Sequence, residues 1–248
     1  MKKPNNTDLA IDTTAGALVA LSALTGPIGV AVATVLVAPA QDIFKRLLSP
    51  KERSRIESVV DMARKQIEEE VKKGTPLRTD FSTTSRIAID LEELEEGTLI
   101  TARDSYEEKK LPLLANICTR ALFTNSPIDN LTQSLHTAEI LSYRQLCTLC
   151  LFYSTIMRDA PGLSDLDGQD NKRNDEEWEG AYNDLWILMR EGLLIPVHDK
   201  SITMVFTAYH IVPNDLVLTR PGLWLVNSMA RDNCPPESDV ETIREILK

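Results

Sequence analysis

The feature that most constrains this chain is a run without a single charged residue, from Thr13 to Gln41, flanked by Asp12 and Asp42. Charged residues make up 26% of the whole chain, so the run stands apart from the rest of the sequence. An apolar segment of this length either crosses a bilayer or is buried by protein, because stable proteins seldom leave so much apolar surface exposed. We therefore expect an apolar N-terminal helical segment, residues 1–48, attached to a polar body.

A glycine-proline pair, Gly26-Pro27, divides the uncharged run into two halves. A proline inside a helix removes one hydrogen bond and clashes with the preceding turn, so a break or a kink is expected here. Each half is too short to span about 30 Å of hydrocarbon as a helix, whereas one kinked helix made of both halves is long enough. Four interpretations stay open: a membrane-inserted segment, a buried hairpin that turns at Thr25–Gly29, an oligomerisation helix, and a signal peptide that ends near Ala38-Pro39-Ala40.

The run also supplies the candidate residues for membrane insertion or self-association. Small residues let helices approach closely, and larger apolar residues supply the surface that is buried. These candidates are Gly16, Leu18, Leu21, Leu24, Gly26, Pro27, Ile28, Gly29, Val32, Val35 and Leu36. Lys45 and Arg46 follow the run, and basic residues after a spanning segment predict that the body stays on the cytoplasmic side. A solvated helix face is the alternative interpretation of this basic cluster, which continues with Lys51, Arg53 and Arg55.

The charge balance of the chain limits the classes of partner that it suits. The 248 residues carry a formal net charge of −10, and hydrophobic residues make up 43% of them. A protein that binds nucleic acid neutralises phosphates with a basic face, so nucleic acid is disfavoured as the main partner. The hydrophobic share is near the globular norm, and a chain of this length can bury a core in one or two domains. The partners expected are the bacterial inner membrane, a second copy of the chain, or another protein.

Two of the four cysteines, Cys147 and Cys150, form a C-x-x-C motif inside the apolar segment Leu146–Phe152. A zinc site needs a second pair of Cys or His ligands at a recognisable spacing, and none follows in the sequence. Cysteine outside disulfides is among the residue types that are buried most often. The motif therefore predicts two core thiols in a reducing cytoplasm, and we expect neither a metal nor a cofactor.

Helix signals divide the middle of the chain into segments. Ser49–Glu52 is a typical helix start, with a capping serine, a proline in the first turn and a glutamate three residues after the cap, and Gly74 closes this helix. We predict an amphipathic connecting helix over residues 49–74, a linker over 75–89, a helical core over 90–159 and an acidic loop over 160–177. Within the core, one helix is expected to run from Asp90 to about Leu111, and Ser142 with Gln145 starts another.

The last segment, residues 178–248, is typical of a winged-helix-like α+β module. Apolar residues stripe a helix that ends at Gly192, at Trp178, Tyr182, Leu185 and Met189. Short strands are expected over 193–198 and 202–208, followed by an L-T-x-x-G-x-x-L motif, Leu218–Leu225, where a strand gives way to a helix.

The charges of the helix before those strands bear on what the module binds. Its charged residues are mostly acidic: Glu177, Glu179, Asp184 and Glu191, with Arg190 as the one base. A helix that reads a DNA groove needs Arg, Lys, Asn or Gln facing the bases. A protein partner or a structural role is therefore favoured over DNA.

No residue constellation in the sequence predicts catalysis. The glycine-rich phosphate-binding motifs and H-E-x-x-H are absent, and no Ser or Cys lies in a nucleophile-elbow context. The three histidines are His136, His198 and His210, and His136 is spaced to form a surface pair with Glu139. We interpret three acidic pairs as solvated helix faces: Glu92-Glu93, Glu95-Glu96 and Glu107-Glu108. We therefore expect a non-enzymatic protein with no catalytic residue.

The segment EEKKLPLLANICTRALFTNSPIDNLTQSLHTAEILSYRQLCTLCLF, Glu107–Phe152, is similar to one in uncharacterised bacterial helical proteins. In these proteins an Ala/Gly-rich stretch precedes a helix that opens L-S-P-x-x-R, as Leu48–Arg53 does here. The resemblance runs from about Gly16 to Leu151, with a looser likeness over Leu218–Leu225. The chain also distantly resembles proteins of abortive infection and phage defence. The similar positions are caps and core residues, so the resemblance implies a shared fold and carries over no catalytic residue.

The sequence thus predicts a mainly α protein: a helical bundle with an apolar N-terminal segment and a C-terminal winged-helix-like module. The expected function is that of a non-enzymatic, membrane-associating effector or adaptor, and the resemblance implies a place in bacterial anti-phage defence. The alternative is a soluble regulator whose winged-helix-like module binds a protein partner or DNA. We expect an oligomer in the cytoplasm or at the cytoplasmic face of the inner membrane.

Overall fold

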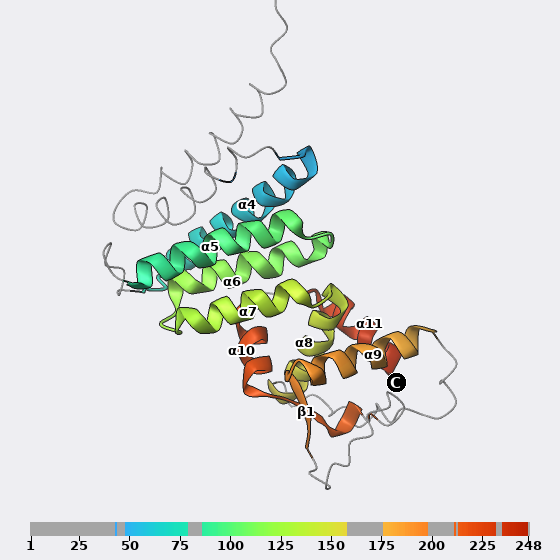
Figure 1. The fold of residues 1–248 in the computed structure, drawn as a ribbon. Coiled ribbons are helices and arrows are strands. Elements are labelled where there is room, and N and C mark those ends of the chain that lie inside the picture. The colour runs from blue at the N-terminus through green and yellow to red at the C-terminus, as the bar shows by residue number, and fades with distance from the viewer. Residues whose placement is uncertain are drawn as a thin grey trace, which may run out of the picture. The chain divides into compact units, whose positions relative to one another are not determined.

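The computed structural model of the chain describes Ile43 and residues 48–78, 86–157, 176–197, 211, 213–231 and 235–247. These residues form a mainly helical fold with a small two-stranded sheet (Figure 1). The chain divides into two compact units: unit 1 ends at Leu135 and unit 2 begins at His136. The uncharged run, most of the predicted acidic loop and the strand predicted over 202–208 lie outside the described residues.

The described elements follow the order of the chain. Unit 1 contains α4 (Pro50–Lys73), α5 (Arg86–Asp104), the short 3-10 helix η2 (Glu108–Lys110), α6 (Leu111–Phe123) and the first part of α7 (Ile128–Ile140). Unit 2 contains the end of α7 and then α8 (Tyr143–Met157), α9 (Glu176–Arg190), β1 (Leu194–Pro196), η6 (Pro213–Asp215), β2 (Leu216–Leu218), α10 (Arg220–Met229) and α11 (Glu237–Leu247). The predicted helical core, 90–159, thus has residues in both units.

Helix α4 has the two ends that the sequence predicts. The Ser49 hydroxyl accepts a hydrogen bond from the Glu52 amide at 3.3 Å, and the Ser49 amide donates to the Glu52 carboxylate at 2.6 Å. At the other end Gly74 has φ 77° and its amide donates to the last carbonyls of the helix. Only glycine adopts this left-handed conformation without strain, which fixes the end of the helix here.

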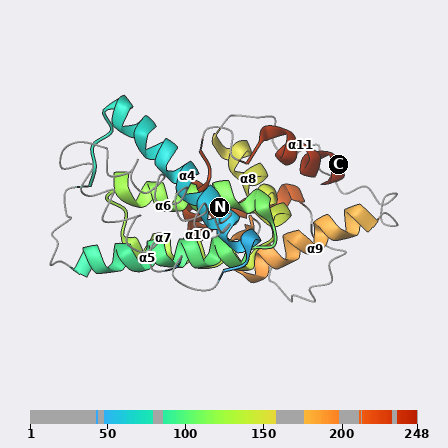
Figure 2. The same cartoon turned by 90° about the horizontal axis from the view of Figure 1, so that it is seen from above.

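The core of unit 1 lies where α4, α5 and α6 pack against one another (Figures 1 and 2). Helix α4 contributes a buried stripe at helical spacing: Ile56, Val59, Val60, Ala63 and Ile67. Helix α6 is buried over most of its surface, as its apolar sequence predicts. The predicted linker begins with residues that pack on this core, because the Arg78 guanidinium is buried and donates to the Ala121 carbonyl at 3.3 Å.

The prediction of a single helix from Asp90 to about Leu111 is wrong at both ends. Helix α5 already includes Arg86, so Asp90 lies inside it, and α5 ends at Asp104. A new helix, α6, then starts with a proline in its first turn. Pro112 has no amide hydrogen, so it fits the first turn of a helix and would interrupt a continuous one. The chain therefore leaves α5 before this proline and restarts at Leu111.

Unit 2 is built around α8, which packs against α9, α10 and α11. The sequence of α8 is apolar around most of its circumference, and Phe152 at its centre is one of the largest fully buried side chains. Its start is the capping box that the sequence predicts: Ser142 accepts from the Gln145 amide at 3.2 Å, and the Ser142 amide donates to the Gln145 side chain at 2.9 Å. A central helix of this kind needs apolar residues on every side, which explains its composition.

A short antiparallel ribbon follows α9. Strand β1 pairs with β2 in the register Leu194↔Leu218, Ile195↔Val217 and Pro196↔Leu216. The Val197 amide donates to the Asp215 carbonyl, so these two residues form a hydrogen-bonded pair. Hydrogen-bonded and non-hydrogen-bonded pairs alternate along an antiparallel ribbon, so Pro196, one residue earlier, makes no ladder bond to β2. A proline is tolerated there because it has no amide hydrogen to offer. A strand was predicted over 193–198, where β1 lies, and the next strand was expected over 202–208. The described partner of β1 is β2.

The L-T-x-x-G-x-x-L motif forms the start of α10, as predicted. The Thr219 hydroxyl accepts from the Gly222 amide at 3.1 Å, so Thr219 caps the helix. A Cβ atom at Gly222 would overlap the backbone carbonyl oxygen of Leu193 and lie 3.0 Å from the Leu218 side chain. The glycine is therefore needed for the close approach of the two segments, independently of its backbone angles.

We expect Gly222→Ala to destabilise unit 2 by about 1–3 kcal/mol, the usual range for overpacking. The backbone oxygen of Leu193 cannot move aside as a side chain does, so α10 must shift. Urea unfolding followed by tryptophan fluorescence measures this, since the chain's three tryptophans, Trp178, Trp186 and Trp224, all lie in unit 2. Gly180→Ala is the control, because its new Cβ would meet only the movable end of a side chain, that of Arg144. Equal losses for the two variants would contradict the explanation.

Candidate functional site

The residues predicted for membrane insertion or self-association lie outside the described residues. They are Gly16, Leu18, Leu21, Leu24, Gly26, Pro27, Ile28, Gly29, Val32, Val35 and Leu36, and the flanking bases Lys45 and Arg46 lie outside as well. Ile43, between the run and these bases, is helical and fully buried. Among the helices that the structure describes, none is long and apolar enough to cross a membrane.

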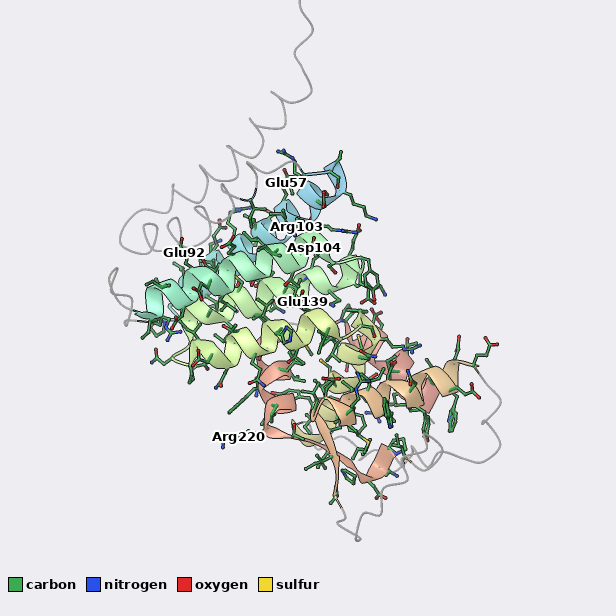
Figure 3. The ribbon with its side chains drawn as sticks, viewed as in Figure 1. Glu57, Glu92, Arg103, Asp104, Glu139 and Arg220 are labelled. Atoms are coloured by element: carbon green, nitrogen blue, oxygen red, sulfur yellow. The ribbon has the colours of Figure 1, made fainter. Side chains whose placement is uncertain are left out.

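The basic residues at the start of α4 have partners within unit 1. The Lys51 ammonium lies 3.9 Å from the Glu108 carboxylate, and the Arg55 guanidinium donates to the Arg103 carbonyl at 3.1 Å. Arg103 in turn is paired with Asp104 at the end of α5 (Figure 3). Arg55 therefore satisfies a carbonyl group of the last turn of α5, a structural role for part of the basic cluster.

In unit 2, helix α9, the helix before the predicted strands, has an acidic outer face. Trp178, Tyr182 and Leu185 are buried, whereas Met189 is half-buried. Glu176, Glu177 and Glu179 are exposed in the first turn, where negative charge is favourable to the helix dipole. This face would repel the phosphates of a nucleic acid.

One of the acidic residues that the sequence counts on this helix, Asp184, is buried. The Asp184 side chain is 3% exposed, and it accepts a hydrogen bond from the Arg144 guanidinium on α8. The other oxygen of Asp184 accepts from the side-chain amide of Gln145 at 3.0 Å. The Arg144 guanidinium also donates to the Gly180 carbonyl at 3.1 Å. This polar cluster fixes how α9 lies on α8. Asp184 falls three residues after buried Ala181, a spacing that could have revealed it.

The C-x-x-C motif lies on α8, where Cys147 and Cys150 are both buried and reduced. This agrees with the prediction of two core thiols. Tyr143, one turn before Cys147, donates its hydroxyl to the Asp239 carboxylate at 2.9 Å and so links α8 to α11. Burial raises the pKa of the Tyr143 phenol, and the neighbouring Cys147 and Asp239 raise it further. Among the described residues, no group of His, Cys, Asp and Glu gathers as a metal site would require.

The His136 and Glu139 side chains form the surface pair that their spacing predicts. Their nearest atoms, Nδ1 and an oxygen, lie 3.6 Å apart, and both side chains are more than half exposed. Glu139 is labelled in Figure 3. His198 and His210 lie outside the described residues.

The outer face of the ribbon and its neighbours in unit 2 carry exposed apolar and cationic groups. Ile195 on β1 is 48% exposed, and Val197, directly after the strand and two residues on, is 51% exposed. Two arginines lie over tryptophan rings at 5.3 Å: Arg190 over Trp186 on α9, and Arg220 over Trp224 on α10. Arg220 is labelled in Figure 3. Such a mixture of apolar, aromatic and arginine groups is typical of surfaces that bind proteins.

In unit 1 the structure corrects one of the acidic pairs that the sequence assigned to solvent. Glu95 is fully buried in α5, and neither of its carboxylate oxygens has a hydrogen-bond partner in the described part of the chain. Glu92, one turn earlier, is exposed (Figure 3). Glu95 lies on the stripe of Leu91, Thr98 and Ala102 at helical spacing, all of them buried, and this spacing could have identified it.

The buried carboxyl of Glu95 acts on the thiol of Cys118 on α6. Burial raises the pKa of Glu95 well above its usual range, and the charge of Glu92 adds to the rise. The Cys118 thiol is also fully buried. Its burial is the main cause that raises its pKa, and the charge of Glu95 raises the pKa further. A protonated carboxyl and a protonated thiol are the forms that such an apolar site favours.

No family model, curated protein or solved structure matches the chain. The resemblance to abortive-infection proteins therefore stays a prediction.

Proposed function

We propose that this chain is a non-enzymatic, membrane-associating effector or adaptor whose N-terminal segment inserts into, or assembles at, the bacterial inner membrane. One observation carries the proposal: the uncharged run Thr13–Gln41 on a chain with 26% charged residues. Transferring such a run from water into hydrocarbon is favourable at about 25 cal/mol per Å² of apolar surface. Lys45 and Arg46 directly after it favour retention of the body on the cytoplasmic side. The further assignment to anti-phage defence depends on the sequence resemblance alone.

The body in this proposal is a helical bundle that ends in a winged-helix-like module. The order α8, α9, β1, β2 and α10, with β1 and β2 antiparallel, supports the module. The packing of α4, α5 and α6 supports the bundle. In this proposal the bundle and the module together carry the N-terminal segment and bind a protein partner that activates the effector.

The expected result is that Ile28→Asp with Val32→Asp removes the protein from the membrane fraction. Each aspartate costs about 2.5–3.5 kcal/mol at the centre of a spanning helix. The free-energy cost of the two aspartates therefore exceeds the free energy gained when the neighbouring apolar side chains enter the membrane. The measurement is fractionation of cells followed by carbonate extraction of the membrane pellet. The matched control adds the same two charges at exposed positions of the body, Ser54→Asp with Thr132→Asp, and is expected to stay with the membrane. The proposal is wrong if the protein with Ile28→Asp and Val32→Asp stays in the membrane pellet after carbonate extraction.

Removal of residues 1–41 separates this proposal from a soluble regulator in which the run is buried by the body. A membrane effector is expected to become a well-behaved soluble protein, because the deleted segment is not part of its core. A regulator that packs the run as a hairpin is expected to aggregate, since its removal exposes the apolar surface that covered it.

The second candidate function is a soluble regulator that binds a protein partner through the winged-helix-like module. The acidic outer face of α9 favours this over DNA binding, as do the exposed side chains of Ile195 and Val197. We expect the full chain to bind random duplex DNA more weakly than about 10⁻⁴ M at physiological salt, the weak limit of ordinary non-specific binding. Fluorescence anisotropy with labelled duplex at two salt concentrations measures this. Micromolar binding that weakens steeply with salt would establish DNA as a partner instead.

A further inference from the structure

A buried acid lies in unit 1 where three helices meet. Glu95 on α5 has an exposed fraction of 0%, and both of its oxygens lack a hydrogen-bond donor within the described residues. Its apolar neighbours in the sequence, Leu91, Leu94 and Leu99, are buried as well, so the acid belongs to the packed face of α5. Buried carboxyl groups in stable cores are normally paired or hydrogen-bonded, and among the described residues this one is neither.

The same three helices and the residue that ends α6 hold further polar atoms that are buried without a partner. They are Nε of Arg55 and Oε1 of Gln66 on α4, Oγ1 of Thr119 on α6, and Oγ1 of Thr124 just after it. Together with the two oxygens of Glu95 these make six of the seven such atoms in the described residues; the seventh belongs to Trp178 in unit 2. Each of these groups would gain water as a partner if the helices separated, so the packed arrangement is penalised relative to a looser one.

Two arginines of α4, which packs against α5, are engaged by groups other than Glu95. Arg64 is held by Asp61 at 2.9 Å and by Glu68 at 2.7 Å, and Arg55 donates to the Arg103 carbonyl. Other charged groups lie on the described parts of α6, α7 and α5. On α6, Cys118 is the titratable group that interacts with it, and Arg120 is exposed. The part of α7 in unit 1 approaches α5 at Gly97 through Leu135, and its one charged residue, Asp129, is exposed. On α5 itself, Glu92 adds negative charge.

We propose that unit 1 is a conformational switch, in which α5 separates from α4 and α6 without the unfolding of unit 2, and the hydration of the Glu95 carboxyl favours the open arrangement. In the closed arrangement the carboxyl is held neutral by its apolar surroundings. In the open arrangement it ionises at neutral pH and releases one proton to water. The open arrangement is therefore favoured as the pH rises above the ordinary range of a glutamate. This switch needs no membrane and acts within unit 1 alone.

A thiol inside unit 1 reports on this opening. Cys118 is fully buried beside Glu95 and is the one cysteine of unit 1, whereas Cys147 and Cys150 are buried in unit 2. The full chain is incubated with iodoacetamide between pH 5.5 and 7.5, and the modification of each cysteine is followed by peptide mass spectrometry. Each rate is divided by the rate of the same cysteine in the urea-unfolded chain at the same pH. This removes the pH dependence of the thiolate and leaves the fraction of time that the site is open.

The expected result is that Cys118 is modified faster than Cys147 and Cys150 after this correction. Its corrected rate is expected to rise by up to tenfold per pH unit, because opening releases one proton. Glu95→Gln is expected to abolish this rise and to slow the modification of Cys118 at pH 7.5. Glu92→Gln, which removes a negative charge from an exposed position of the same helix, is expected to retain the rise.

Three results would overturn the switch. One is a corrected Cys118 rate that does not change with pH in the unaltered chain, which decides the matter even if Glu95→Gln fails to fold. Another is an equal rise with pH in the unaltered chain and in Glu95→Gln. The third is a Cys118 rate that equals those of Cys147 and Cys150 throughout, since the opening would then be the unfolding of the whole chain.

Discussion

Asp184→Ala is expected to destabilise unit 2 by about 3 kcal/mol, at the lower end of the loss for a broken buried ion pair. The carboxylate is 3% exposed and accepts from both Arg144 and Gln145, so its removal leaves two donors without their acceptor. The loss is limited because the Arg144 side chain is 47% exposed and can turn to water. Its bond to the Gly180 carbonyl also remains.

Urea unfolding followed by tryptophan fluorescence measures this loss, since all three tryptophans belong to unit 2. Glu179→Ala is the matched control: it removes an acid from the exposed face of the same helix and is expected to change the stability by less than about 0.5 kcal/mol. Equal stabilities for Asp184→Ala and Glu179→Ala would mean that the hydrogen bonds of Asp184 do not stabilise unit 2. The stability of α9 on α8 would then depend on apolar packing alone.

The second large effect is a fall in the unfolding free energy of unit 1 as the pH rises. The pKa of Glu95 is raised by burial in the folded chain, so between the ordinary pKa of glutamate and the raised one the folded state binds one more proton than the unfolded state. Stability then decreases by about 1.4 kcal/mol for each pH unit across that window. Below the ordinary pKa both states are protonated and the effect vanishes.

The comparison that isolates this effect is the difference between the unaltered chain and Glu95→Gln. Asp61 and Asp104 act in the opposite direction, because hydrogen bonds from Lys65 and Arg64, and from Arg103, lower their pKa values. Their contributions are lost only as the pH falls below about 4, so they do not disturb the slope above pH 5. Urea unfolding is followed by far-UV circular dichroism from pH 5 to 8, with tryptophan fluorescence to identify the transition of unit 2. Parallel slopes for the two proteins would show that Glu95 is ionised in the folded chain.

The starts of α4, α8 and α10 could be predicted from the sequence because each is decided by residues a few positions apart, whereas both ends of α5 were missed. Ser49 and Glu52, Ser142 and Gln145, and Thr219 before α10 all make the caps that their spacing indicates. The partner of β1 could not be predicted in this way. Strand pairing depends on residues distant in the chain, and the described partner of β1 begins only at Leu216.

The buried acids were missed for a different reason. Glu95 was assigned to solvent because carboxylates are seldom buried, and Asp184 was counted only as one of the acidic charges of its helix, although both lie at helical spacing from buried apolar residues. For Asp184 the decisive partner is Arg144 on another helix, which no local pattern reveals. For Glu95 the described structure offers no partner at all, so its burial follows from the apolar stripe around it. Spacing was the better guide than residue type in both cases.

Pro196 has a consequence for the behaviour of the protein at high concentration. A strand that is not covered on one side can template the addition of another chain, which is a common route to aggregates and fibrils. Among the described residues β1 pairs with β2 alone, and Pro196 lies where β1 makes no ladder bond to β2, so its missing amide hydrogen is on the edge opposite β2. An incoming strand would lose a hydrogen bond and meet the proline ring at that point. A chain that exposes Ile195 and Val197 on the same ribbon thus carries a local safeguard against intermolecular β-structure.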